Sequence, residues 1–255
     1  ALWGYRAVFV VTASLSVLAM VLTAVFVREP PRRERGARAA EPIQVWNLLR
    51  DVVGDVTGLL SNKALRMAML VVFAVRFGAQ LVDPVLALWV EQLDGWEPGR
   101  LNSATGLVFG VYAAATLLAT PLWGRLGDRH GARALFLVSA SGAAVLGLLH
   151  VFTETVGELA ILRFVFGGAL AGVVPAAFAA ASHHSSVEDR GGAYGVTFSA
   201  VILARALGPV AGGAVAGSFG LPVLFVISAI IMGGAGLAVG LRALQAARAQ
   251  RRRPA

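Results

Sequence analysis

Gly124-Arg-Leu-Gly-Asp-Arg-His-Gly-Ala-Arg133 is the stretch that decides the fold of this 255-residue chain. It separates two apolar segments, 102–123 and 134–152, and each is long enough to cross a lipid bilayer as a helix. Its ten polar and glycine-rich residues leave room for little more than a tight turn, in which glycines let the backbone reverse direction. The stretch therefore predicts two helices joined by a short turn at a membrane surface.

The composition also describes a membrane protein. The chain is 57% hydrophobic and 14% charged, with a mean hydropathy of +0.74, which is too apolar for a soluble domain of this length. Its apolar runs are continuous rather than alternating, which excludes a β-barrel. We expect an all-α polytopic membrane protein with seven transmembrane helices. The predicted spans are approximately 7–27, 66–90, 102–123, 134–152, 158–181, 192–217 and 221–243.

The distribution of basic residues predicts the orientation. If the seven helices alternate in direction, 17 of the 22 Lys and Arg fall on one side of the membrane, and only Arg6 and Arg100 fall on the other. The positive-inside rule places the basic side and the C-terminus in the cytoplasm, and we expect the plasma (inner) membrane. The basic tail 251–253 then anchors the chain near anionic lipid, so the net charge of +8 indicates the lipid bilayer and no nucleic acid as partner.

An internal repeat bears on the domain organisation. Gly4–Ala13 matches Gly220–Ala229 at a constant offset of 216 residues. Transporters are commonly built from tandem halves, which predicts such a match, although two apolar helices can also look alike by chance. If 221–243 is the sixth helix of one half, then 7–27 is the sixth helix of a preceding half. Five further helices are then expected upstream.

Between these helices, residues 28–65 are expected to connect the two halves. The first part is rich in Arg, Glu and Pro, and the second part is an amphipathic helix that lies on the inner membrane surface or packs against the bundle. The predicted parts are 1–27 as the last helix of the N-terminal half, 28–65 as a cytoplasmic inter-half loop, 66–243 as a six-helix C-terminal half, and 244–255 as a basic cytoplasmic tail.

The pattern G-x-L-x-D-R-x-G-x-R at 124–133 resembles the signature loop of the major facilitator superfamily, which follows the second helix of each six-helix half. Segments 88–93, 103–109 and 120–129 are similar to drug:proton antiporters of the MdtG and tetracycline-efflux type. The resemblance implies export of small, drug-like or lipophilic compounds in exchange for protons. It implies no cofactor, with the proton gradient as energy source, and the missing N-terminal half (helices one to five) as partner.

The resemblance also implies a gate. In the family, the loop aspartate caps a helix of the opposite half and locks the outward-facing state, and a carboxylate near a helix N-terminus is electrostatically favoured. The partner helix would belong to the missing half, and a simple turn with a local salt bridge is the alternative. The matching residues are Gly124, Leu126, Asp128, Arg129, Gly131 and Arg133.

Two further stretches resemble structural motifs of the antiporters. In 161–172 an intramembrane arginine precedes glycines, and this arginine either faces protein or water or extends to the outer interface. In 204–213 glycines flank a proline, a combination that bends a helix and lets a neighbour approach closely. The residues of these motifs are Arg163, Gly167, Gly168, Gly172, Gly208, Pro209, Gly212 and Gly213.

Polar residues inside the spans are candidates for a substrate and proton pathway. Arg76, Gln80 and Asp83 share one face of the second span, which must look at a cavity or another helix. Asp83 is the only acid well inside a span, so it is the candidate proton carrier, although Asp83-Pro84 is also a common way to restart a helix. Arg205 lies near the midpoint of its span, where a functional or charge-paired role is expected.

Other classes of function find little support in the sequence. The absence of cysteine excludes thiolate metal sites, and the adjacent His183 and His184 cannot share a helix face, so we expect no metal. No phosphate-binding glycine loop or nucleophile triad is present, so we expect no enzyme. Two alternatives stay open. One is a superfamily transporter of sugars or organic anions, since two buried arginines against one acid suit an anion. The other is a non-transporting membrane interaction subunit.

Overall fold

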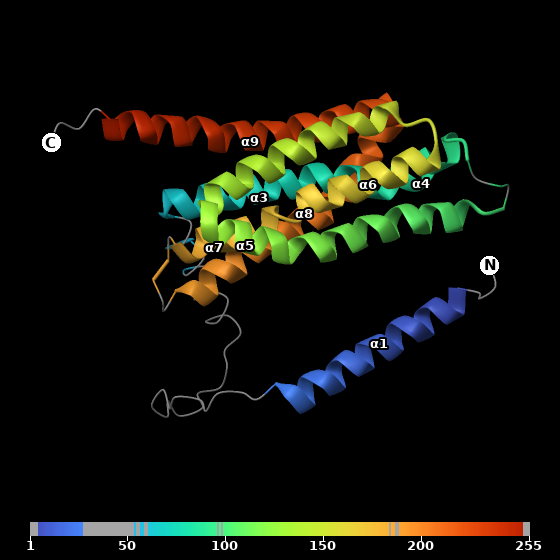
Figure 1. The fold of residues 1–255 in the computed structure, drawn as a ribbon, viewed down its shortest axis with the longest axis horizontal. Coiled ribbons are helices and arrows are strands. Elements are labelled where there is room, and N and C mark those ends of the chain that lie inside the picture. Colours follow the sequence, from blue (N-terminus) through green and yellow to red (C-terminus); the bar gives the residue numbers. More distant parts are fainter. Residues whose placement is uncertain are drawn as a thin grey trace. The chain divides into compact units, whose positions relative to one another are not determined.

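The computed structural model describes residues 5–27, 54, 57–58, 61–95, 97, 99–183, 185–186 and 189–251, and every named element in this part is a helix (Figure 1). Six helical stretches are long and apolar enough to cross a membrane. One of them, Leu101–Phe152, contains two of the predicted spans. The expected all-α, polytopic membrane fold is confirmed, with about seven crossings.

The chain divides into two compact units, 1–52 and 53–255. The first contains α1 (Tyr5–Phe26), whose side chains from Phe9 onward are all exposed. A helix that is apolar on every side suits a lipid environment. Most of the predicted inter-half loop and the last four residues of the predicted tail lie outside the described residues, as does His184.

The second unit is a bundle of helices, and two of its crossings are broken. The second crossing is α3, a short 3-10 turn and α4, so the helix changes its winding at Asp83 and then resumes. The crossing formed by α6 and α7 is interrupted at Ala171 and Gly172. The elements are α3 (Lys63–Val82), η1 (Asp83–Val85), α4 (Leu86–Gln92), α5 (Leu101–Leu149), η2 (His150–Phe152), α6 (Val156–Leu170), α7 (Val173–His183), α8 (Arg190–Phe219) and α9 (Leu221–Arg251).

Helix α5 contains the stretch that predicted a turn. Its helical hydrogen bonding runs through 124–130, and only Gly131 departs from helical dihedral angles, with φ 80° and ψ 159°. The two legs of α5 on either side of this kink run in opposite directions (Figure 1). The expectation of a ten-residue turn is therefore wrong in extent. One residue at positive φ reverses the chain, because glycine adopts that conformation without a steric penalty.

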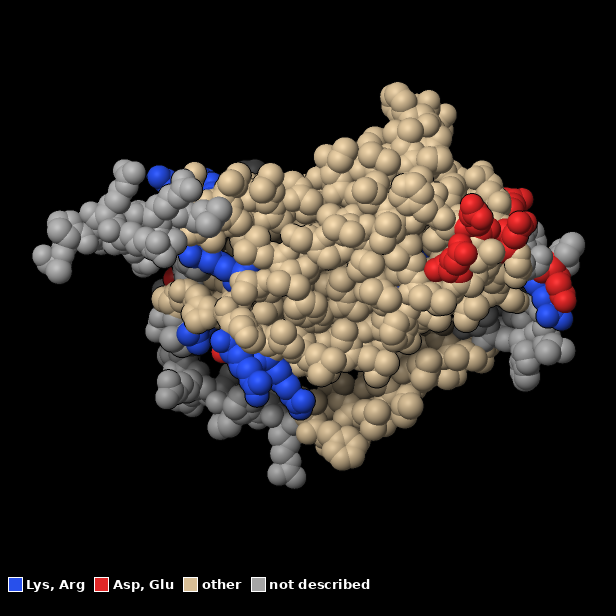
Figure 2. Space-filling model, turned by 45° about the horizontal axis from the view of Figure 1, so that its top comes forward, with Lys and Arg blue, Asp and Glu red and all other residues tan. Residues whose placement is uncertain are grey.

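The core surrounds α3, which packs against α7, α8 and α9. One cluster of buried side chains includes Val72, Val75 and Met232, and a second, beside η1 and α4, includes Leu86 and Phe225. Most charged side chains lie at the ends of the bundle, and Arg163, beside Phe166 of the first cluster, is a buried exception. On the face shown in Figure 2, most Lys and Arg gather at one end of the molecule and most Asp and Glu gather at the other. This separation is the distribution on which the predicted orientation rests.

Candidate functional site

Asp83 lies at the junction of α3 and η1, where both of its carboxylate oxygens are engaged by side chains. Gln80 donates from Nε2 to Oδ2, and Arg163 donates from Nη1 to Oδ1 at 3.3 Å. Gln80 is one helical turn earlier on α3, whereas Arg163 comes from α6. Within the described residues, the partners of Asp83 are therefore an amide and a guanidinium, and not the backbone N–H groups that a helix cap would bind.

Arg163 is 2% exposed and is the bulkiest of the fully buried side chains. Thr155 and Glu158 form a capping box that starts α6, which places Arg163 about two turns inside the helix. Its guanidinium carbon lies 5.9 Å from the ring centroid of Tyr112 and 5.7 Å from that of Phe166. Arg163 therefore faces protein and does not extend to the interface, which settles the choice that the sequence left open.

The guanidinium of Arg163 is only partly satisfied. Its Nε and Nη2 atoms are buried without a hydrogen-bond partner in the described part of the chain. The charge is compensated by Asp83, whose side chain is 28% exposed, and by the two aromatic rings. A buried ion pair is held together by its mutual attraction in a medium of low dielectric, so loss of either charge leaves the other uncompensated.

Arg76 and Arg205 extend the charged region away from this pair. Arg76 is half-buried on α3, and Tyr112, Arg205 and Asp83 are its electrostatic neighbours. Arg205, on α8, is exposed. Neither arginine forms an ion pair within the described residues. The structure thus brings the four predicted pathway residues into one region, in which Asp83 pairs with Arg163 and Arg76 has both Asp83 and Arg205 as electrostatic neighbours.

Close packing of α8 on α3 fixes the backbone beside Gln80 and Asp83. A Cβ at Gly212 would lie 2.0 Å from the carbonyl oxygen of Leu81, and one at Gly208 would lie 2.5 Å from the Cβ of Gln80. Gly213 has nothing within 4 Å, so it takes no part in this contact. Only a residue without a side chain fits at such distances, so these two glycines let α8 support the polar face of α3.

The glycines of α6 and its extension pack against α5. A Cβ at Gly167 would lie 2.6 Å from the carbonyl oxygen of Tyr112, and one at Gly172 would lie 2.2 Å from the Oγ of Ser139. The indole of Trp123 donates a hydrogen bond of 2.7 Å to the carbonyl oxygen of Gly168. These contacts between α6 and α5 hold Tyr112 next to Arg163. On α8, Pro209 lies inside the helix without ending it.

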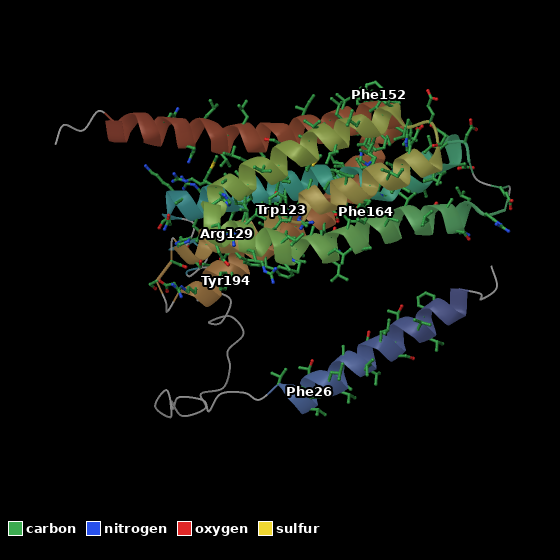
Figure 3. The ribbon with its side chains drawn as sticks, viewed as in Figure 1. Phe26, Trp123, Arg129, Phe152, Phe164 and Tyr194 are labelled. Carbon is green, nitrogen blue, oxygen red and sulfur yellow. The ribbon has the colours of Figure 1, made fainter. Side chains whose placement is uncertain are left out.

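The signature residues lie beside the kink of α5 and do not join the Asp83 region. The side chains of Leu126, Asp128, Arg129 and Arg133 are exposed, and Asp128 forms no ion pair within the described residues. Figure 3 shows Arg129 near the kink and Phe164 on α6, the helix that carries Arg163. A Cβ at Gly124 would meet nothing within 4 Å. Among the described residues, the local salt bridge of the simpler alternative is not formed.

Tyr112 and Phe166 were not predicted as site residues. A single aromatic residue in an apolar span carries no signal of its own, since such residues most often fill a core. The pairing of Tyr112 with Arg163 depends on the packing of α5 on α6, which places residues 51 apart in the sequence in contact. Within the described residues no group of three or more His, Cys, Asp and Glu could hold a metal ion.

Comparison with known proteins identifies the family. The model of the Major Facilitator Superfamily matches residues 68–255. The chain belongs to this superfamily, as the signature stretch predicted. The multidrug resistance protein MdtG of Proteus mirabilis is 35% identical over 155 residues, which cover 60% of this chain and 38% of the relative.

Other MdtG proteins give the same result over different lengths. The protein of Salmonella paratyphi C is 36% identical over 152 residues, or 60% of this chain and 37% of the relative. That of Salmonella arizonae is 27% identical over 228 residues, or 89% of this chain and 54% of the relative. The chain spans about half the length of the curated relatives it matches. Over the matched residues it is similar to multidrug resistance proteins.

Proposed function

We propose that this chain forms the C-terminal half, preceded by the last helix of the N-terminal half, of a secondary active transporter. The transporter exports small lipophilic or drug-like compounds in exchange for protons. Its partners are the substrate, the lipid bilayer and the N-terminal half with helices one to five. Family membership and the multidrug resistance relatives support this proposal, and the ion pair of the partly exposed Asp83 with the buried Arg163 carries the proton-linked part of it.

The ion pair offers a way to couple protons to a conformational change. When Asp83 is ionised, it compensates the charge of Arg163 and ties α3 to α6. When Asp83 takes up a proton, the attraction is lost and the buried guanidinium stays uncompensated. Arrangements that give Arg163 another partner or water are then favoured. Proton binding thereby shifts the balance between states of the half, which is what an exchanger requires.

Substrate is proposed to bind near the membrane midplane, between the two halves. The exposed Arg205 and the half-buried Arg76 are this half's charged contribution, with Gln80 as a neutral hydrogen-bonding group. Transport of an organic anion is the second candidate, because these two arginines form no ion pair in the described part of the chain. A lipophilic cation would instead depend on the aromatic residues and on the other half.

The signature turn is proposed to act as the gate of the cytoplasmic side, with Asp128 capping a helix of the other half.

The orientation proposed from the basic residues places the chain in the plasma membrane with its C-terminus in the cytoplasm. Labelling of single cysteines tests this orientation, since the native chain has none. A cysteine at Arg190 should react only from the cytoplasmic side, and one at Arg100 only from outside. The reverse pattern would refute the orientation.

The function is tested in proteoliposomes that contain the complete transporter, this chain together with the five preceding helices. A pH gradient should drive accumulation of the lipophilic cation ethidium, and accumulation of salicylate instead would favour the anion alternative. Asp83→Asn should abolish the gradient-driven accumulation, while exchange of labelled for unlabelled substrate without a gradient persists. Asp94→Asn, at an exposed acid outside the spans, is the control. Unchanged pH dependence in Asp83→Asn would exclude Asp83 as the proton carrier.

A further inference from the structure

A pocket of about 490 Å³ opens beside the Gly131 kink, away from the Asp83 region. Its walls come from α3, both sides of the α5 kink, α7 and α9. Sites for small organic ligands commonly measure about 300–1,000 Å³, so this pocket has the size of a binding site. None of the residues that line it belongs to the proposed substrate and proton pathway.

The inner wall of the pocket is apolar. Met67 and Val71 contribute from α3, Phe136 from the second leg of α5, and Val239 from α9. Val71 and Phe136 also belong to the buried core, so this wall is rigidly packed from behind. Such a surface suits a hydrocarbon chain and offers nothing to a small hydrated ion.

The rim of the pocket is basic. Arg133 and Arg242 line it together with the imidazoles of His130 and His183, and all four side chains are exposed. No acid is among the lining residues in the described part of the chain. Two guanidinium groups and two imidazoles can all donate hydrogen bonds to an anion, and guanidinium binds phosphate oxygens especially well.

The pocket lies at the end of the bundle where several candidate membrane spans begin or end. Its residues stand at the ends of three candidate spans, because Lys63–Gln92 begins beside it and both Val156–His183 and Leu221–Ala243 end there. This end of the bundle carries most of the Lys and Arg in Figure 2. Basic pockets between transmembrane helices on the cytoplasmic side are sites for acidic phospholipid headgroups.

We propose that this pocket binds an anionic phospholipid. One acyl chain lies against Met67, Val71, Phe136 and Val239, and the phosphate is held by Arg133 and Arg242. The lipid thereby links the signature turn of α5 to the end of α9, two elements that carry like charges and would otherwise repel each other. This proposal is independent of the transported substrate and of the proton-linked acid.

Binding is tested on the protein purified in a neutral detergent, in the full length that its gene encodes. Dioleoyl phosphatidylglycerol is the anionic probe, dioleoyl phosphatidylcholine the zwitterionic one, and inorganic phosphate the headgroup anion without an acyl chain. Native mass spectrometry counts retained lipids, and the thermal unfolding midpoint reports stabilisation. We expect one tightly retained phosphatidylglycerol, which raises the midpoint, and weaker retention of phosphatidylcholine.

Variants separate the rim from the wall. Replacing both rim arginines, Arg133→Gln with Arg242→Gln, should weaken phosphatidylglycerol binding about 30-fold. The matched pair Arg125→Gln with Arg190→Gln removes two exposed arginines that do not line the pocket, and it should leave binding unchanged. Ala180→Phe narrows the apolar part without altering the rim, and it should weaken lipid binding as well. If the glutamine pair fails to fold, the pair Arg133→Lys with Arg242→Lys replaces it in the test. This pair keeps both charges and should retain the lipid.

Several results would overturn the proposal. Equal retention of phosphatidylcholine would show that charge is not recognised, and full binding by the rim pair of variants would place the lipid elsewhere. Inorganic phosphate that displaces the lipid and raises the midpoint equally would indicate a site for free anions. Efficient disulfide formation between cysteines at Met67 and within residues 43–60 would show that the chain's own segment fills the pocket.

Discussion

Arg163 and Arg205 both lie well inside apolar spans, yet they differ in burial and in ion pairing. Arg163 is 2% exposed, pairs with Asp83 and lies over two aromatic rings. Arg205 is exposed on α8 and forms no ion pair in the described part of the chain. The charge of Arg163 is paired within the described part of the chain. The charge of Arg205 depends on water, substrate or another part of the protein, and this dependence identifies the surface on which function is expected.

The largest expected effect on stability is that of replacing the buried arginine, Arg163. Arg163→Met should lower the free energy of unfolding by about 3 kcal/mol, because it leaves the partly buried carboxylate of Asp83 without its counter-charge. Arg205→Met should change it by about 0.5 kcal/mol or less, as at other exposed positions. Unfolding in mixed detergent micelles, followed by circular dichroism, measures both. Equal effects of the two substitutions would remove the distinction between the two arginines.

A second pair of variants tests how α8 is held against α3. Gly212→Ala should destabilise the protein by about 1–3 kcal/mol, since the added Cβ would lie 2.0 Å from a backbone oxygen of Leu81. Gly213→Ala places the same methyl group in open space one residue later, and it should be neutral or stabilise α8 by up to about 1 kcal/mol. The same unfolding measurement compares them. A stable Gly212→Ala protein would contradict the close contact.

A smaller effect is expected at the signature turn. Gly131→Ala should cost about 1–2 kcal/mol, because the residue has a φ of 80° that an L-residue adopts only with strain. Gly124→Ala, in a helical and open position, should not destabilise the protein. Neither site lacks space for a methyl group, so the difference isolates the backbone conformation. If both variants melt at the same temperature, the reversal is not concentrated at Gly131.

The sequence was sufficient for the features that depend on local composition. Apolar length gave the spans, and the glycine and arginine spacing at 124–133 gave the superfamily. The length of the turn was overestimated from the sequence. The pattern does not show that a single glycine at positive φ is enough to reverse the chain, or that the residues before it continue the helix. The signature was therefore recognised correctly even though its local conformation was not.

The sequence could not supply the partnership at the centre of the candidate site. Asp83 and Arg163 are 80 residues apart, and their contact depends on how α3 and α6 pack through the whole bundle. Periodicity places a charge on one face of a helix and says nothing about which helix covers that face. For the same reason, Arg163 could be assigned either to the interface or to the interior, and Tyr112 was not identified at all.

In the proposed function, this chain supplies one half of a transporter, and the exposed charges of this half face a pathway shared with the other half. Alternating access requires one half to move against the other around a common site. The direct test is reconstitution of the 255-residue chain in liposomes with a pH gradient, with and without co-reconstituted helices one to five. We predict no saturable uptake of ethidium by the chain alone, and uptake when both parts are present. Saturable, gradient-driven uptake by a monomer of the chain alone would contradict the account.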